Sequence, residues 1–125
     1  MVVLMKLRKI LYSPAYGAGW TSWADRRDIK QFMLTYQPII DYLEAGNDFK
    51  GIKLDKIYDR AGKPTILGHL PACLQQFVAD CQERFGEVPY LAGARDLEIE
   101  EVNCLVKITD FDGYEHIKYC NEDWI

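Results

Sequence analysis

The sequence lacks the short motifs that identify several common classes of protein. None of its four cysteines forms a Cys-x-x-Cys pair, and neither of its two histidines has zinc-finger spacing. No stretch approaches the roughly 20 apolar residues that cross a membrane, and the N-terminal residues contain no signal-peptide cleavage site. We therefore predict no metal, no membrane partner and a cytoplasmic protein with buried, reduced thiols.

Catalytic motifs are also lacking. The chain has no Gly-x-Ser-x-Gly elbow, no His-Glu-x-x-His motif, no Gly-Lys-Ser/Thr phosphate loop and no Gly-x-Gly-x-x-Gly fingerprint. The candidate nucleophiles and bases, which show no recognised mutual spacing, are Ser13, Ser22, His69, Cys104 and His116. We predict no catalytic residue and no cofactor, and a small hydrolase is the least favoured alternative.

Positive charge is scarce too. Fifteen lysines and arginines stand against nineteen acidic residues, which gives a formal net charge of -4. Binding to a nucleic-acid polymer depends on clustered basic residues that neutralise phosphates. The small basic clusters, Lys6 to Lys9 and Arg26–Arg27, are interpreted as solvated surface charge. A nucleic-acid polymer is therefore excluded as the expected partner.

The chain is rich in apolar residues, and their spacing predicts alternating helices and strands. Hydrophobic residues make up 49% of its 125 positions, enough for one compact domain over residues 1–125. The expected elements are a strand over residues 2–12, a helix over 23–35 with Ser22 as its N-cap, a short helix from Pro38 to Gly46, a helix over 71–85, and strands near 90–92, 97–102, 105–108 and 114–119.

This order predicts an α+β fold, with a mostly antiparallel sheet and two or three helices packed on one face. Asp112-Gly113 is typical of a tight hairpin turn, and a bulge is expected near Glu100 or Glu101. Residues 47–70 are broken repeatedly by glycine and proline. We expect them to form an irregular excursion or a flap over the core.

The most unusual stretch is Ile10 to Trp23, which joins the first strand to the first helix. Free amides and the helix dipole favour an anion at such a junction. The residues predicted to bind a ligand here, by stacking, by backbone amides or by charge, are Tyr12, Ser13, Tyr16, Gly17, Gly19, Trp20, Trp23, Arg26 and Arg95. Two alternatives stay open: the tryptophans pack in the core of a tight turn, and Arg95 pairs with Asp96.

Four segments of the chain resemble a widespread family of small bacteriophage and prophage proteins. They read YSPAYGAGWTSW, FMLTYQPIID, FGEVPYLAGARDLEIEEV and ITDFDGYEHI, and they leave out about residues 47–70 and the last few residues. Family members carry a YSPGYGAGW-like opening and a closing EYDGxExI-like hairpin, and this chain departs from the opening at Ala15. The resemblance implies a phage accessory protein in the cytoplasm of a bacterial host. Small phage proteins of this kind often counter host defence, by sequestering nucleotide signals or by binding host proteins.

Two functional hypotheses follow from these observations. The first is a non-enzymatic protein that holds a small anionic, nucleotide-like ligand at the Ser13–Ser22 loop and sequesters it. The second is a protein-interaction module whose exposed aromatic residues inhibit a host protein. A small sheet also leaves edge strands that can pair, so a homo-oligomer is a further possibility.

Overall fold

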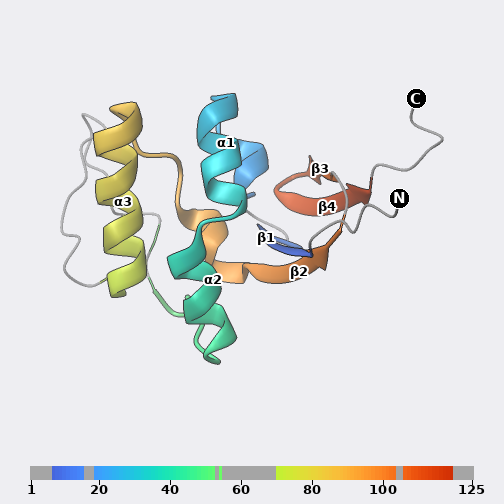
Figure 1. Cartoon of the computed structure of the whole chain (residues 1–125), viewed down its shortest axis with the longest axis horizontal. Helices are drawn as coiled ribbons and strands as arrows, with labels where there is room; N and C mark the ends of the chain where they lie inside the picture. Colours follow the sequence, from blue (N-terminus) through green and yellow to red (C-terminus); the bar gives the residue numbers. More distant parts are fainter. Residues whose placement is uncertain (1–6, 16–18, 53, 55–69, 104–105, 120–125) are drawn as a thin grey trace, which may run out of the picture.

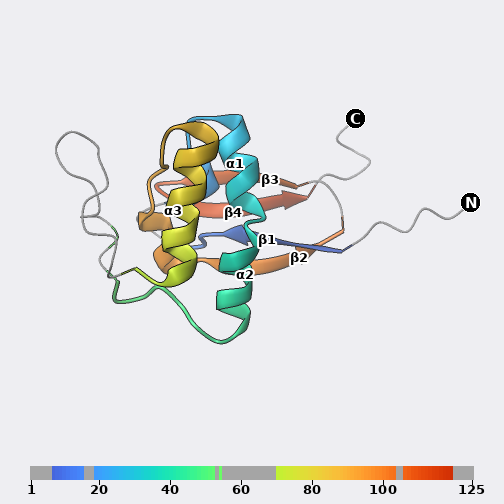
Figure 2. The same ribbon diagram turned by 60° about the vertical axis from the view of Figure 1, so that its left-hand side comes forward.

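The computed structural model describes residues 7–15, 19–52, 54, 70–103 and 106–119. Its elements in chain order are β1 (Arg8–Tyr12), the 3-10 turn η1 (Thr21–Trp23), α1 (Arg27–Leu34), α2 (Gln37–Glu44), α3 (Ala72–Phe85), the 3-10 turn η2 (Ala92–Asp96), β2 (Glu98–Val102), β3 (Val106–Phe111) and β4 (Tyr114–Tyr119). The predicted α+β fold is confirmed, with all three helices on one side of the strands (Figures 1 and 2).

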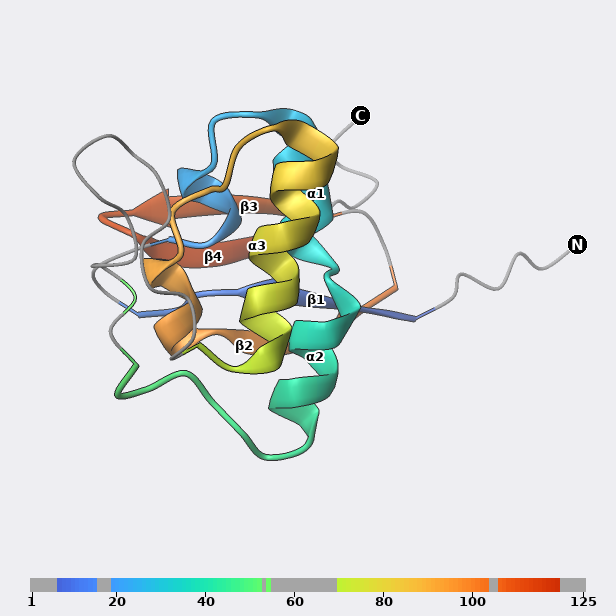
Figure 3. The same cartoon turned by 90° about the vertical axis from the view of Figure 1, so that its left-hand side faces the viewer.

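The strands form two antiparallel pairs, β1 with β2 and β3 with β4. The Glu115 amide of β4 donates a hydrogen bond of 2.8 Å to the Ser13 carbonyl just after β1, which brings the two pairs together. Figure 3 accordingly shows the strands side by side in the order β3, β4, β1, β2. The predicted bulge is wrong, because Glu100 pairs with Ile10 and Glu101 with Lys9 without an extra residue.

Local signals place the ends of several elements. Asp112 and Gly113 both have positive φ, 49° and 82°, and close the predicted β3–β4 hairpin. Pro38 lies in the first turn of α2, as predicted, and Gly46 follows that helix with φ of 91°. Gly86 ends α3 in the left-handed conformation.

Two predicted elements are wrong. The first helix begins at Arg27 rather than Trp23, and Ser22 lies in η1, where its hydroxyl binds a distant carboxylate instead of capping a helix. Tyr90 and Leu91 are not in a strand, and Ala92 begins η2. The predicted flap lies largely outside the described residues, as do residues 2–6 of the predicted first strand.

The core lies between the helices and the strands. Trp20 is fully buried, with its ring 5.2 Å from that of Phe77, and its Nε1 donates a 3.0 Å hydrogen bond to the Met33 carbonyl. Cys81 is also buried, and burial raises the pKa of its thiol to about 12. No helix in the described part of the chain is long and apolar enough to cross a membrane.

Candidate ligand-binding site

The loop predicted to bind an anion already holds one, the carboxylate of Glu115. This β4 residue is 1% exposed. Its Oε1 accepts a hydrogen bond from the Ser13 amide at 2.8 Å, and its Oε2 accepts from the amides of Trp20 and Ser22 at 2.8 and 2.9 Å. The Ser22 hydroxyl donates a fourth bond, at 2.6 Å. A buried carboxylate needs several donors of this kind, and the loop amides supply them.

Two glycines allow this arrangement. A Cβ atom on Gly19 would lie 2.3 Å from Ser22 Oγ and 2.6 Å from Trp23 Cδ1. A Cβ atom on Gly93 of η2 would lie only 2.1 Å from the Gly19 carbonyl oxygen. Gly19 was predicted to give a ligand access to the backbone. The structure instead shows that the space at its Cα is filled by the protein, and that η2 packs directly on the loop.

Several other predicted site residues are buried or bound to groups of the protein itself. Trp20 is in the core, so its ring cannot stack on a bound molecule. Ser13 is 1% exposed, and its amide is bound to Glu115. Arg26 binds the carboxylate of Asp28 at 2.7 Å and the Phe85 carbonyl at the end of α3 at 2.9 Å. All three residues thus make their described contacts within the protein, and Arg26 binds a carbonyl at the end of a helix.

The remaining predicted residues divide into three groups. Trp23 is 39% exposed and stacks on Tyr90, with ring centroids 5.7 Å apart. Tyr16 and Gly17 lie outside the described residues. Tyr12 and Arg95 line one and the same hollow.

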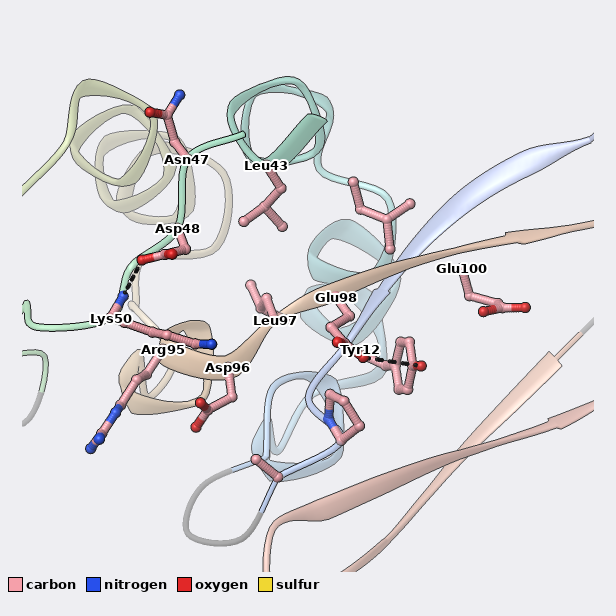
Figure 4. Close-up of a pocket in the computed structure, with 13 residues that line it drawn as sticks. Tyr12, Leu43, Asn47, Asp48, Lys50, Arg95, Asp96, Leu97, Glu98 and Glu100 are labelled. Carbon is pink, nitrogen blue, oxygen red and sulfur yellow. Dashed lines mark hydrogen bonds between the residues drawn. The ribbon is translucent and has the colours of Figure 1, made fainter. Parts of the chain in front are cut away.

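That hollow, which we call the strand-end cleft, has a volume of about 700 Å³. It lies between the end of β1 with Pro14 and Ala15, the segment after α2, and the passage from η2 into β2 (Figure 4). Its charged lining residues are Asp48, Lys50, Arg95, Asp96, Glu98 and Glu100. Pockets for small ligands typically measure roughly 300–1,000 Å³, so the cleft has a suitable size.

The cations and the tyrosine occupy different ends of the strand-end cleft. Figure 4 shows Lys50 extending into it and Arg95 pointing outward at one end, with Tyr12 and Glu98 at the other. The pair predicted between Arg95 and Asp96 does not form, and Arg95 makes no ion pair with any described carboxylate. Burial and the charges of the nearby glutamates raise the pKa of Tyr12, so its hydroxyl stays protonated. This hydroxyl donates a long hydrogen bond, of 3.5 Å, to Glu98 Oε2.

A smaller hollow of about 260 Å³ shares three lining residues with the strand-end cleft: Tyr12, Pro14 and Glu100. We call it the tyrosine hollow. It adds aromatic residues of β4: the rings of Tyr114 and His116 have centroids 4.6 Å apart, and the Tyr119 hydroxyl donates to Glu100 Oε1 at 3.1 Å. Between them, the two hollows are lined by cationic side chains, carboxylates and aromatic rings.

The sequence-based prediction missed Lys50, Glu98, Glu100 and the aromatic residues of β4. Glu98 and Glu100 alternate with Leu97 and Ile99, which is typical of the solvated face of a strand and gives no hint of a shared cleft. No group of three or more possible metal ligands occurs among the described residues. A comparison with protein-family models, curated proteins and solved structures finds no match to this α+β chain.

Proposed function

We propose that this protein binds a small nucleotide-like anion in the strand-end cleft and the tyrosine hollow. The single observation that carries the proposal is that the two hollows share Tyr12, Pro14 and Glu100 and that their linings combine cations, carboxylates and aromatic rings. The site differs from the one predicted from the sequence, since the amides of the Ser13–Ser22 loop are held by Glu115.

Each part of a nucleotide has a matching group in these two hollows. Lys50 and Arg95 are suited to a phosphate, and arginine can bind two of its oxygens at once. Glu98 and Glu100 can accept hydrogen bonds from sugar hydroxyls or from amino groups of a base. Tyr114 and Tyr119 offer rings on which a base can stack. The four carboxylates disfavour a simple anion and favour a ligand that also carries hydrogen-bond donors.

Holding the nucleotide without converting it would lower its free concentration. This is what a sequestering protein does, and the resemblance to small bacteriophage proteins suggests a nucleotide signal of the host cell as the target. The first experiment is to denature the purified protein and analyse the released small molecules by mass spectrometry. A nucleotide released in stoichiometric amount supports the proposal.

The matching prediction is that Lys50→Ala and Arg95→Ala each weaken nucleotide binding about tenfold, because each removes one charged contact worth about 1.5 kcal/mol. Isothermal titration calorimetry with the released nucleotide, or with a panel of ribonucleotides, measures the effect. Lys118→Ala is the control, since Lys118 is exposed on β4 and lines neither hollow. The proposal fails if no ribonucleotide binds the wild type, or if all three variants bind equally well.

One observation favours protein binding as a second candidate function. Trp23 and Tyr90 stack on each other and are 39% and 41% exposed, and Trp23 Nε1 donates to Asp110 Oδ2 at 3.2 Å. Rigid, partly exposed aromatic residues are typical of interaction hot spots.

If this pair binds a host protein, Trp23→Ala with Tyr90→Ala is expected to reduce capture of that protein from bacterial lysate at least tenfold. Phe111→Ala is the control, because Phe111 is the more exposed aromatic residue at 64%. Equal capture by all variants with unchanged melting temperatures would contradict the idea.

A further inference from the structure

A separate hollow of about 440 Å³ lies between α1 and β3 and shares no lining residue with the strand-end cleft or the tyrosine hollow. Its walls come from one face of α1, including Lys30 and Leu34, and from Val106, Lys107 and Ile108 of β3. We call it the α1–β3 groove.

The α1–β3 groove runs along the edge of β3. Successive side chains of a strand point to opposite faces, so Val106 and Ile108 face one way and Lys107 faces the other. A hollow that touches all three must therefore follow the edge of the strand. Figure 3 agrees, because β3 is the outermost of the four strands and β4 separates it from β1.

No described strand pairs with the outer edge of the β3 backbone. In a hairpin with a two-residue turn, the residues flanking the turn form a hydrogen-bonded pair, and bonded and non-bonded pairs then alternate. Counting from Phe111 and Tyr114, the N–H and C=O groups of Val106 and Ile108 point away from β4. The same alternation predicts that the Glu115 amide points toward β1, and this amide does donate a hydrogen bond to the Ser13 carbonyl. Within the described residues, no hydrogen bond to Val106 or Ile108 from outside the hairpin is formed.

The charge of the α1–β3 groove is positive. Arg27 and Lys30 of α1 and Lys107 of β3 line it, against the single carboxylate of Asp25. None of these three cations forms an ion pair with a carboxylate in the described part of the chain. Among the described residues, the cations that line the groove therefore outnumber its one carboxylate and are not paired with it.

The groove also contains apolar and unsatisfied polar groups. Leu34, Val106 and Ile108 line it and are half-buried. Thr21 lines it too, is 3% exposed, and its Oγ1 has no hydrogen-bond partner among the described residues. Buried hydroxyl groups are normally hydrogen-bonded, so Thr21 Oγ1 is an exception among the described residues.

We propose that the α1–β3 groove binds an extended acidic peptide segment of a partner protein, which adds to β3 as a further strand. The peptide backbone pairs with Val106 and Ile108. Because the side chains of a strand alternate between its two faces, the acidic ones meet Lys107, while the intervening apolar ones face α1 and contact Leu34. Arg27 and Lys30 add to the positive charge that attracts the peptide. Strand addition to an open sheet edge, with specificity from the adjoining groove, is a common way for proteins to recognise peptides.

Fluorescence anisotropy with labelled six-residue peptides tests the proposal on the full chain. A peptide of alternating glutamate and valine is expected to bind at least tenfold more tightly than its lysine–valine counterpart. Methylation of its backbone nitrogens is expected to weaken binding at least tenfold, because strand pairing needs those N–H groups. Equal binding of the methylated peptide would overturn the proposal, since charge attraction alone would then explain the affinity.

A matched pair of variants provides the second test. Lys107→Glu is expected to weaken binding of the acidic peptide at least tenfold, and Lys118→Glu to change it less than twofold. Lys118 is the residue paired with Lys107 across the hairpin, but it does not line the groove. Equal losses in the two variants would overturn the proposal. A protein that sedimentation shows to be a dimer, and that the peptide does not dissociate, would also overturn it, because a second copy would then occupy the edge.

Discussion

Replacing Glu115 by glutamine is expected to lower the free energy of unfolding by about 3 kcal/mol. The two carboxylate oxygens accept four hydrogen bonds, all from donors in the Ser13–Ser22 loop. A glutamine amide has one oxygen and one NH₂ group. Its least costly orientation places the NH₂ group against the Ser13 amide, so that two donors face each other in a buried site, and the charge that strengthens the other three bonds is lost.

Urea unfolding, compared at equal m-value, measures this loss. Glu101→Gln is the control, because Glu101 is exposed on β2 and its replacement is expected to change stability by less than about 0.5 kcal/mol. Amide hydrogen exchange locates the effect: the Ser13, Trp20 and Ser22 amides should exchange faster in Glu115→Gln. If Glu115→Gln were as stable as the control, the carboxylate would not be what holds the loop.

A double-mutant cycle with Ser22→Ala separates the contribution of the hydroxyl group. The Ser22 hydroxyl makes the shortest of the four bonds, at 2.6 Å, so the two substitutions should be clearly non-additive. The β3–β4 hairpin depends on the same contact, because the Glu115 amide binds Ser13 beside the carboxylate. Loss of the carboxylate is therefore expected to loosen the joint between the two strand pairs as well as the loop.

The helices and the hairpin could be predicted because their signals are local. Gly46 and Gly86 follow the last turns of α2 and α3, and Asp112-Gly113 closes a turn that joins adjacent strands. Each of these positions depends on the backbone conformation of one or two residues. Such a preference is present in the sequence whatever the rest of the chain does.

The role of the Ser13–Ser22 loop could not be predicted in the same way. Glycines and free amides before a helix have the same sequence pattern whether the anion is a ligand or a side chain of the protein itself. Glu115 is 93 residues from Ser22 and 102 from Ser13, so no local pattern connects them. One signal was present in the sequence of β4. Glu115, Ile117 and Tyr119 are two residues apart, so the Glu115 carboxylate lies on the same face of the strand as two largely apolar side chains.

The strand-end cleft illustrates a second limit. Tyr12 and Arg95 were both predicted site residues, and the structure places both in the cleft. Lys50 also lines the cleft but was not predicted, because it comes from a segment after α2 that has no periodic pattern. Convergence of three separate segments is a property of the tertiary fold. Residue type can therefore suggest which side chains bind, but not which of them meet.

The largest packing effect is expected for Gly93→Ala, which should cost about 3 kcal/mol or more of unfolding free energy. The added Cβ atom would lie 2.1 Å from the Gly19 carbonyl oxygen and 2.8 Å from the Trp20 amide nitrogen. Both are backbone atoms, so no side-chain rotation relieves the clash. The Gly19–Trp20 peptide is itself fixed, since its amide binds Glu115 and the Trp20 ring fills the core.

Gly46→Ala is the matched control, because it makes the same chemical change where a Cβ atom would have no neighbour within 4 Å. Gly46 has φ of +91°, so its replacement should cost only about 1–2 kcal/mol of backbone strain. Comparing the two variants in urea separates strain from packing. If Gly93→Ala were no less stable than Gly46→Ala, η2 would not press on the loop. If Gly93→Ala is much less stable than Gly46→Ala, the loop is held by three residues together. Gly93 and Gly19 allow the two backbones to approach, and the Glu115 carboxylate binds the loop amides beside them.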